Sequence, residues 1–270
     1  MTDTEKFLAG QTALITGGAS GIGAACAIEL ARRGANTVIN YLSSRDQAEE
    51  VAQHCRDFGV RSAIIQTDVS KEQEVDDMYS AVLDQFKKLH ILIANAGIQK
   101  DASFVDMSFD QWQKVLAVNL TGQFLCAQKA ARIFCSQGFD SSVSMSAGKI
   151  VHISSVHDEI PWAGHINYAA SKGGIKMLME SAALELAAQK IRINSVSPGA
   201  IKTRINKPVW SDPERAEELL KLIPYRRIGD VEDVAKPVAW LVSDAADYIT
   251  GTTLYIDGGM TLYPGFYENG

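Results

Sequence analysis

Short apolar runs rich in β-branched residues alternate along the chain with longer segments whose apolar positions recur at helical spacing. The short runs predict seven strands, at residues 12–16, 37–41, 62–67, 91–95, 149–155, 191–197 and 252–257. The longer segments predict helices at residues 22–34, 44–58, 71–86 and 110–135, and a further helix that carries Tyr168. Strands that alternate with helices form βαβ units, which place a parallel sheet between two helical layers. With right-handed crossovers, the predicted fold class is α/β: a single doubly wound Rossmann-type domain with a seven-stranded parallel sheet.

No linker rich in Pro, Gly or Ser divides the chain, so we expect residues 1–270 to form one domain. Two segments look like insertions. Residues 136–148 are rich in Ser and Gly and predict an exposed loop. Residues 202–228 follow the sixth strand and contain three prolines. Because loops beyond the carboxyl ends of strands form the ligand crevice, this second segment is a candidate substrate lid, with a packed helical excursion as the alternative.

Composition narrows the choice of partners. The net charge of −6 leaves no broad basic surface for phosphate backbones, which argues against nucleic acid.

The four cysteines lie far apart with no CxxC pair, as is typical of reduced thiols in the cytoplasm. The first ten residues carry early acids and no long apolar run, so we expect no signal peptide. The apolar stretches are also too short and too interrupted to span a membrane.

The first strand is followed by a glycine turn, "TGGASGIG" at residues 16–23. Gly17 can adopt turn dihedrals that other residues avoid, and Gly21 and Gly23 allow the next helix to begin close to a ligand. The N-terminus of that helix offers free N–H groups and a positive dipole end to an anion. The spacing is GxxxGxG and not GxGxxG, but its place after the first strand of a βαβ series predicts a dinucleotide pyrophosphate site.

The end of the second strand bears on the choice between NAD and NADP. An acid there would bind the ribose of NAD, but Tyr41 and Leu42 occupy the position. A 2′-phosphate is therefore not repelled, and Ser43 and Arg45 could receive one. Alternatively, Arg45 is only a solvated residue in the first turn of the next helix, so the preference between the two cofactors stays open.

The stretch "NYAASKGGIK" (residues 167–176) places Tyr168 and Lys172 four residues apart. On a helix these positions share a face, which brings a phenol beside an ammonium. A neighbouring cation favours the phenolate and lowers the pKa of the phenol from about 10. Such a tyrosine can act as a general acid or base near neutral pH. The alternative for an isolated YxxxK pair is a surface lysine beside a half-buried tyrosine.

The glycine turn, "NAG" (95–97), "SS" (154–155), "YAASK" (168–172) and "PGAIKT" (198–203) follow one another in a characteristic order. In these motifs the chain resembles the short-chain dehydrogenase/reductase family from about residue 11 to residue 263. The stretches "ISSVHDEIPW" (153–162) and "YIDGGMTLYPGF" (255–266) are most similar to the bacterial glucose 1-dehydrogenase subgroup.

The resemblance implies an enzyme with an NAD(P)(H) cofactor and assigns roles to four residues. Ser155 would hydrogen-bond the reacting oxygen, and Tyr168 would carry the proton. Lys172 would hold the nicotinamide ribose and keep the pKa of Tyr168 low. Asn119 would join a proton relay to Lys172, or would be a buried amide that bridges two elements.

The resemblance also implies a set of cofactor contacts. Asp68 and Val69 would meet the adenine, and residues 95–97 would lie along the ribose. For Ile201, plain packing is the alternative to a nicotinamide contact. Besides Tyr168, Lys172 and the residues already named at the glycine turn and second strand, the expected cofactor-binding residues are Ser20, Ile22, Asp68, Val69, Asn95, Ala96, Gly97, Pro198, Gly199, Ile201 and Thr203.

Substrate contacts are expected from Ser155, Tyr168 and His157, with a solvated loop position as the alternative for His157. Histidines with metal-ligand spacing are absent from the sequence, so we expect no catalytic metal. The small-molecule substrate implied by the resemblance is glucose, oxidised at C1 to a lactone. A different alcohol, steroid or acyl thioester is the alternative, and a dinucleotide-binding regulator without turnover is the alternative of another class.

The resemblance further implies a homotetramer, in which the apolar tail at residues 260–267 is a candidate interface strip. Two positions depart from the glucose 1-dehydrogenase pattern. Leu42 stands where a basic residue is frequent, and Gln99 stands where a glutamate is frequent. We expect Gln99 at the rim of the site or at a subunit contact.

Overall fold

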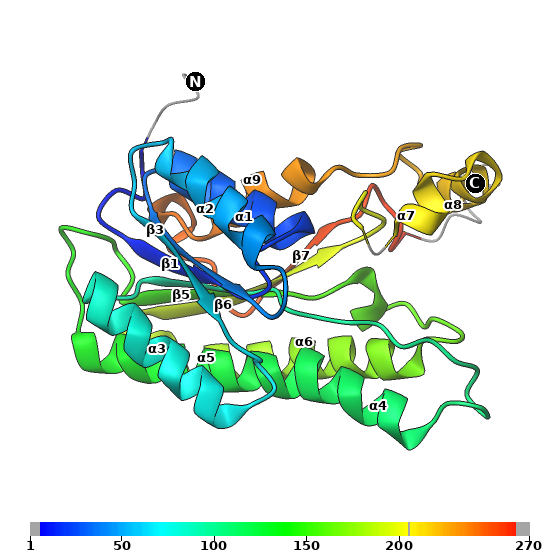
Figure 1. The fold of residues 1–270 in the computed structure, drawn as a ribbon, viewed down its shortest axis with the longest axis horizontal. Helices are drawn as coiled ribbons and strands as arrows, with labels where there is room; N and C mark the ends of the chain where they lie inside the picture. The colour runs from blue at the N-terminus through cyan, green and yellow to red at the C-terminus, as the bar shows by residue number, and fades with distance from the viewer. Residues whose placement is uncertain (1–5, 205, 263–270) are drawn as a thin grey trace.

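Seven parallel strands form the central sheet, in the order β3-β2-β1-β4-β5-β6-β7 (Figure 1). The computed structural model describes residues 6–204 and 206–262. All six neighbouring pairs are parallel, which confirms the predicted seven-stranded parallel sheet. The strands are β1 (Thr12–Ile15), β2 (Asn36–Tyr41), β3 (Ser62–Gln66), β4 (Ile91–Ala94), β5 (Gly148–Ile153), β6 (Ile191–Pro198) and β7 (Thr253–Ile256).

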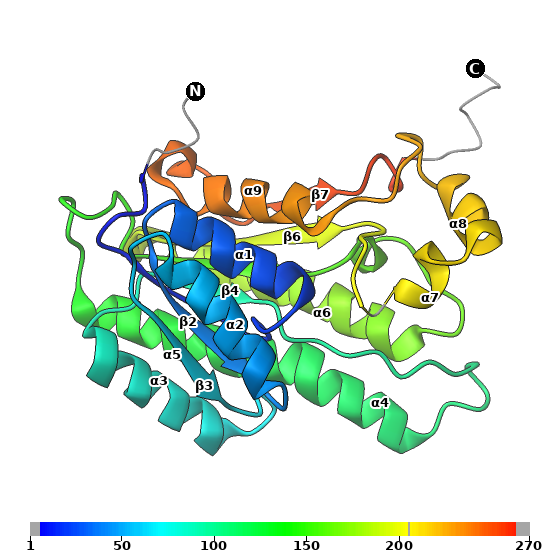
Figure 2. The same ribbon diagram turned by 45° about the horizontal axis from the view of Figure 1, so that its top comes forward.

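Helices cover both faces of the sheet (Figures 1 and 2). One layer contains α1 (Gly21–Arg32), α2 (Arg45–Arg56) and α9 (Val231–Leu241), and the other contains α3 (Glu72–Phe86), α5 (Gly122–Gln137) and α6 (Ile166–Leu186). Successive strand residues point to opposite faces, so Ile15 belongs to the core under the first layer and Leu14 to the core under the second. Within the described residues, no helix is both long enough and apolar enough to cross a membrane.

The segment predicted as one helix at 110–135 is continuous but not uniform. It consists of α4 (Phe109–Leu116), a π-helical turn η1 (Ala117–Thr121) and α5. Single π-helical turns are rare within α-helices and occur frequently at functional sites. The turn carries Asn119, whose side chain is buried.

The loop at 136–148 is only partly exposed, in contrast to the prediction. Its tip is exposed, but Ser144 and Ser146 are buried and donate hydrogen bonds to Asp244 (2.7 Å) and Asp247 (3.2 Å). These hydrogen bonds hold the loop against a segment that is distant in sequence. The sequence pattern does not reveal such contacts. It leads into the amino end of β5, at the opposite edge of the sheet from the carboxyl ends of the strands (Figure 1).

Residues 202–228 project beyond the carboxyl ends of β6 and β7 (Figure 2). They contain two short helices, α7 (Lys207–Trp210) and α8 (Pro213–Leu220), of which no described residue is buried. Ile223, which follows α8, is buried and fastens the segment to the body of the protein. The segment is therefore attached at its ends but packs little of its own surface against the core.

The strand order places a crevice at one edge of the sheet. From β1 the chain proceeds outward to β2 and β3, and then returns to β4 on the other side of β1. At such a switch point, loops from the carboxyl ends of two neighbouring strands leave in opposite directions and open a ligand site between them.

Candidate active site

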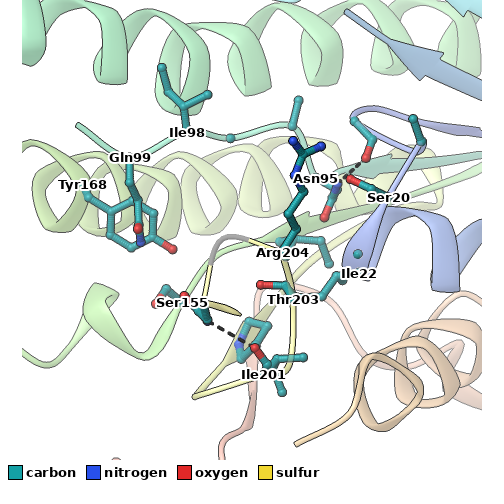
Figure 3. Close-up of a pocket in the computed structure, with 18 of the residues that line it drawn as sticks. Ser20, Ile22, Asn95, Ile98, Gln99, Ser155, Tyr168, Ile201, Thr203 and Arg204 are labelled. Carbon is teal, nitrogen blue, oxygen red and sulfur yellow. Dashed lines mark hydrogen bonds between the residues drawn. The ribbon is translucent and has the colours of Figure 1, made fainter. Parts of the chain in front are cut away.

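A pocket of about 430 Å³ opens at the carboxyl ends of β1, β4, β5 and β6. Figure 3 shows Ser155, Gln99 and Tyr168 together at one end, with Ser20, Ile22 and Asn95 at the other. Most of the residues predicted to bind cofactor or substrate line it: Gly17, Ser20, Gly21, Ile22, Tyr41, Leu42, Ser43, Asn95, Ala96, Gly97, Ser155, Tyr168, Lys172, Pro198, Gly199, Ile201 and Thr203. The predicted residues that do not line it are Gly23, Arg45, Asp68, Val69, Asn119 and His157.

The glycine turn has the shape and the free N–H groups that an anion requires. Gly17 and Gly21 have positive φ angles, 60° and 57°, which favour glycine. Ser20, the N-cap of α1, makes no capping hydrogen bond with its side chain, and the first turn of α1 contains no acid. The N–H groups at the start of a helix have no partner within it. The turn therefore fits a pyrophosphate group.

Gly23 contributes to packing and not to the surface of the pocket. A Cβ atom at this position would lie 2.4 Å from the Gly17 carbonyl oxygen and 2.5 Å from Asn95 Nδ2. The glycine allows α1 to start directly against the turn. The prediction that Gly23 contacts the cofactor is therefore not supported, because the turn itself covers this residue.

Asn95 fastens the end of β4 to the glycine turn. Its Nδ2 donates to the carbonyl oxygens of Thr16 and Gly17, both at 3.0 Å, and its backbone N–H donates to Thr16 Oγ1 at 2.9 Å. The side-chain amide is thus committed to holding the turn, while the residue still lines the pocket.

At the end of β2, Leu42 lines the pocket with 61% of its surface exposed. Arg45 is the first residue of α2 and lies exposed outside the lining, as in the alternative of a solvated helix residue. A different arginine, Arg204, does line the pocket and lies near Asn95 in Figure 3. The residues after β2 therefore supply hydroxyl groups and an apolar side chain to this end of the pocket, and the guanidinium of Arg204 comes from the loop after β6.

Asp68 and Val69 do not line the pocket, and their predicted contact with the adenine stays a prediction. The Asp68 carboxylate accepts hydrogen bonds from the backbone and the hydroxyl of Ser70, at 3.0 and 2.7 Å. Val69 is buried against Gly122, where a Cβ atom would lie 2.9 Å from Val69 Cγ2. Both side chains are engaged by the fold itself.

The predicted catalytic side chains come from β5 and α6. Ser155 follows β5 directly, and Tyr168 and Lys172 lie one turn apart near the start of α6. Lys172 Nζ donates to the Ile153 carbonyl oxygen at 2.8 Å and lies 5.4 Å from the centre of the Tyr168 ring. The ammonium is thus beside the aromatic ring, with one of its protons bound to the end of β5.

The pKa of Tyr168 is raised above its ordinary value, so the predicted lowering by Lys172 is wrong for the chain alone. Burial is the largest cause, hydrogen bonding with Ser155 and Gln99 opposes it, and the Asp158 carboxylate raises the pKa further. Burial also lowers the pKa of Lys172 to about 8, against the opposing effect of Asp158. Removal from water penalises the charged form of both groups.

Asn119 bridges two elements and does not line the pocket. Its Oδ1 accepts from the Ile98 N–H at 2.8 Å, and its Nδ2 donates to the Ile98 carbonyl oxygen at 3.0 Å and to Ser171 Oγ at 3.2 Å. The residue is fully buried. Asn119 is thus the buried amide bridge that the sequence allowed, and the proton relay to Lys172, which such a bridge does not exclude, stays a prediction.

His157 belongs to a stack of rings beside Tyr168. The indole of Trp162 lies between the rings of His157 and His165, with centroid separations of 4.2 and 3.6 Å. His157 Nδ1 is 3.0 Å from the Ile160 carbonyl oxygen. Tyr168 meets the Trp162 ring edge-on at 6.1 Å.

Gln99, Arg204 and Asn206 are among the polar residues of the pocket that were not predicted as contacts. Gln99 was expected at the rim or at a subunit contact, but it lies beside Tyr168 (Figure 3). Each of the three follows the carboxyl end of a strand, Gln99 after β4 and the others after β6. Strand position alone could therefore have suggested them.

Metal ligands do not gather at the pocket. Among residues 6–204 and 206–262, no three His, Cys, Asp or Glu side chains are placed together to hold a metal ion.

Comparisons with known proteins agree with the geometry. Residues 17–261 match a family model described as enoyl-(acyl carrier protein) reductase. The chain is 42% identical over 259 residues to 3β-hydroxysteroid dehydrogenase 1 of Eggerthella lenta, which covers 96% of this chain and 97% of that protein. It is 38% identical over 264 residues to glucose 1-dehydrogenase 2 of Bacillus subtilis, which covers 97% and 99% of the two chains.

A solved structure is similar along nearly the whole length. The short-chain dehydrogenase of Burkholderia cenocepacia in complex with NADP has a TM-score of 0.85 and 33% identity, and the match covers 94% of this chain and 98% of that one. The chain therefore belongs to the short-chain dehydrogenase/reductase family, whose members transfer hydride between a nicotinamide cofactor and an alcohol or carbonyl.

Proposed function

We propose that this oxidoreductase acts on a sugar, with the oxidation of glucose at C1 to its lactone as the first candidate. The observation that carries the proposal is the meeting of Ser155, Tyr168 and Lys172 at one end of the pocket. The subgroup stretch that contains His157 supports a sugar, as does the 38% identical glucose 1-dehydrogenase 2.

The proposed proton path runs through Tyr168. In oxidation the ionised phenol takes the proton of the substrate hydroxyl, and in reduction the neutral phenol returns a proton to the carbonyl oxygen. The Ser155 hydroxyl donates a hydrogen bond to the same oxygen and orients it. Bound nicotinamide supplies or accepts the hydride, a reaction for which the side chains have no equivalent.

The pocket residues divide the binding of the cofactor among them. The N–H groups at Ser20 and Ile22 would hold the pyrophosphate, and residues 95–97 would lie along a ribose. Lys172 would hold the nicotinamide ribose, and Thr203 would meet the nicotinamide amide. Gly199 lines this end of the pocket and packs against the segment after β7, since a Cβ atom there would lie 2.9 Å from Asp257 Cα and 2.8 Å from Met260 Sδ.

A 3β-hydroxysteroid is the second candidate substrate, and one observation favours it. The stacked rings of His157, Trp162 and His165 lie next to Tyr168 but outside the lining of the pocket, so an apolar ring system that extends beyond the Tyr168 end of the pocket would meet them. The 42% identical relative named as a 3β-hydroxysteroid dehydrogenase supports the same substrate class.

Initial rates decide between the candidates. Glucose, other aldoses, a 3β-hydroxysteroid and simple secondary alcohols would each be assayed with NAD and with NADP, by the absorbance of the reduced nicotinamide. The proposal expects the highest kcat/KM with glucose. A higher value with the steroid would establish the second candidate. Tight cofactor binding without turnover on the whole panel would indicate a dinucleotide-binding regulator instead.

We also propose that the protein is a homotetramer in the cytoplasm. Exposed apolar side chains on α5 and α6, namely Phe124, Met177 and Leu184, support an interface on these helices. The candidate interface strip at 260–267 lies outside the described residues from residue 263 onward. Light scattering should give four times the 29.3 kDa of one chain, whereas the mass of a single chain would refute the assembly.

A further inference from the structure

We propose that the side-chain amide of Gln99 is a hydrogen-bond partner of the Tyr168 phenol oxygen and stabilises the phenol in its ionised form. The inference rests on the proposed function, in which Tyr168 exchanges the proton. It assigns Gln99 to the reacting group and not to the rim of the pocket.

The first observation is that the backbone is held on both sides of Gln99. On one side, Asn119 binds both the N–H and the carbonyl oxygen of Ile98, at 2.8 and 3.0 Å. On the other side, Asn167 Nδ2 donates to the Lys100 carbonyl oxygen at 2.8 Å. Both asparagines are fully buried, so this part of the loop has little freedom to move.

The second observation is that the same contacts connect this loop to the helix that carries Tyr168. Asn167 precedes Tyr168 in α6, and its Oδ1 accepts the Tyr168 N–H at 2.8 Å. Asn119 donates to Ser171, also in α6, at 3.2 Å. Because Gln99 and Tyr168 are positioned by the same two asparagines, their separation is fixed by the fold.

The third observation is the direction of the side chain. Gln99 and Tyr168 both line the pocket, and Figure 3 shows the end of Gln99 next to the Tyr168 ring and hydroxyl. Ser155 approaches the phenol from β5, and hydrogen bonding with Ser155 and Gln99 lowers the pKa of Tyr168 against the larger effect of burial.

A primary amide suits a group that gains and loses a proton. It has two N–H donors and one carbonyl acceptor, so it can accept from the neutral phenol and donate to the phenolate. A hydrogen bond to the charged form favours that form. Lys172 acts differently, because its Nζ has three donors and no acceptor, donates one proton to the Ile153 carbonyl oxygen at 2.8 Å and lies 5.4 Å from the centre of the Tyr168 ring.

A substitution at Gln99 leaves the other charged and titratable side chains near the Tyr168 phenol chemically unchanged. Lys172 lies on the same helix, and Arg204 lies in the loop after β6. Asp158, in the 3-10 turn η2 (Val156–Asp158), raises the pKa of Tyr168 and accepts hydrogen bonds from Ser197 at 2.5 Å and Tyr255 at 3.1 Å. Two further titratable residues near Tyr168 are His157 and His165, which stack on Trp162.

The test compares two substitutions of Gln99 with a matched control. Gln99→Glu keeps the shape but replaces the donor with a carboxylate, and Gln99→Leu removes the polar group. Gln113→Glu makes the same charge change at an exposed position of α4, outside the pocket. The readout is the pH at which Tyr168 ionises in the complex with oxidised cofactor. It is obtained as the difference in phenolate absorbance between each protein and the same protein with Tyr168→Phe.

We expect Gln99→Glu to raise this pH by at least about one unit, a tenfold effect. Gln99→Leu should raise it by a smaller amount, and Gln113→Glu should leave it unchanged. The kcat for oxidation at neutral pH should fall about tenfold in Gln99→Glu, while cofactor affinity stays the same. A Tyr168 titration in Gln99→Glu that coincides with that of the parent protein would overturn the inference. Full turnover in Tyr168→Phe would instead refute the proposed function, so the two failures are distinct.

Discussion

Lys172 is buried and Tyr168 is partly buried, and removal from water disfavours the charged form of each residue. The pKa of the phenol is raised above its ordinary value of about 10, and the pKa of the ammonium is lowered to about 8. At neutral pH the resting protein therefore has a neutral phenol and a lysine that is still mostly protonated. This is the state required to give a proton to a carbonyl oxygen.

The two reaction directions should depend on pH with opposite signs. Oxidation requires the phenolate, so its kcat/KM should rise with pH throughout the neutral and mildly alkaline range, because the pKa of Tyr168 in the free protein is raised. Reduction requires the neutral phenol and should be fastest below that range. Initial rates in both directions across pH check this prediction. An oxidation rate that is already constant at neutral pH would contradict it.

Leu42 controls cofactor choice if the adenine ribose lies beside it. The side chain is apolar, largely exposed and part of the pocket lining. Leu42→Arg should increase the ratio of kcat/KM for NADP over NAD about tenfold or more, because a guanidinium forms charge-assisted hydrogen bonds with a 2′-phosphate. Leu42→Met is the control and should leave the ratio unchanged. An equal ratio in Leu42→Arg would mean that the ribose lies elsewhere.

At the scale of elements, the sequence predicted every strand to within two residues, because strands buried on both faces read as short apolar runs. It also predicted the residues of the glycine turn and of the YxxxK pair that line the pocket. It did not predict the π-helical turn at Asn119 or the fastening of Ser144 to Asp244. Both depend on contacts between segments distant in sequence, which local periodicity does not encode.

The same limit explains why some predicted site residues lie outside the pocket and why Arg204 was not predicted. Asp68 stands at the end of a strand, as a ligand-binding residue would, but a local turn with Ser70 occupies its carboxylate. Arg204 lines the pocket because it follows the carboxyl end of β6, but no sequence motif marks it beyond this position. The raised pKa of Tyr168 could not be predicted from the spacing of two residues, since it reflects the depth of the whole pocket.

The packing between β5 and α5 gives a prediction about stability. A Cβ atom at Gly148 would lie 2.1 Å from Cδ2 of the buried Phe134. Gly148→Ala should therefore lower the free energy of unfolding by about 1–3 kcal/mol, as overpacking of a core does. At Gly173, within α6, an added Cβ would meet no atom within 4 Å outside the helix's own backbone. Gly173→Ala should therefore raise the free energy of unfolding by roughly 0.5–1 kcal/mol. Denaturant unfolding measures both, and equal stability of the two variants would contradict the packing argument.

The segment at 202–228 is proposed to be a substrate lid. Its helices α7 and α8 have no buried residue among those described, yet Arg204 and Asn206 at its start line the pocket. Bound cofactor should restrain these helices, because the loop that leads into them meets the ligand. Hydrogen exchange of residues 207–220 should therefore slow when NADP is added. Exchange in this segment that is insensitive to cofactor would favour a helical excursion without a lid function.

At the scale of the whole molecule, each part of the pocket comes from a different stretch of the chain. β1 supplies the glycine turn, β4 the segment with Gln99, β5 the serine, and the loop after β6 the cation. The parallel sheet brings their carboxyl ends to one edge, and α6 places Tyr168 and Lys172 beside them. Under the proposed mechanism, a pocket assembled in this way would bind the cofactor without Tyr168 but would not move the substrate proton without it.

Tyr168→Phe, measured for turnover and cofactor binding in the same preparation, is the most direct test of this account. The substitution removes one oxygen atom and keeps the ring that packs beside Trp162. We expect turnover of the best substrate to fall by a factor of about 100 to 10,000, the usual worth of a general acid or base, while the Kd for the cofactor changes less than about threefold. Turnover within a factor of about two of the parent protein, with the cofactor still bound, would contradict the account.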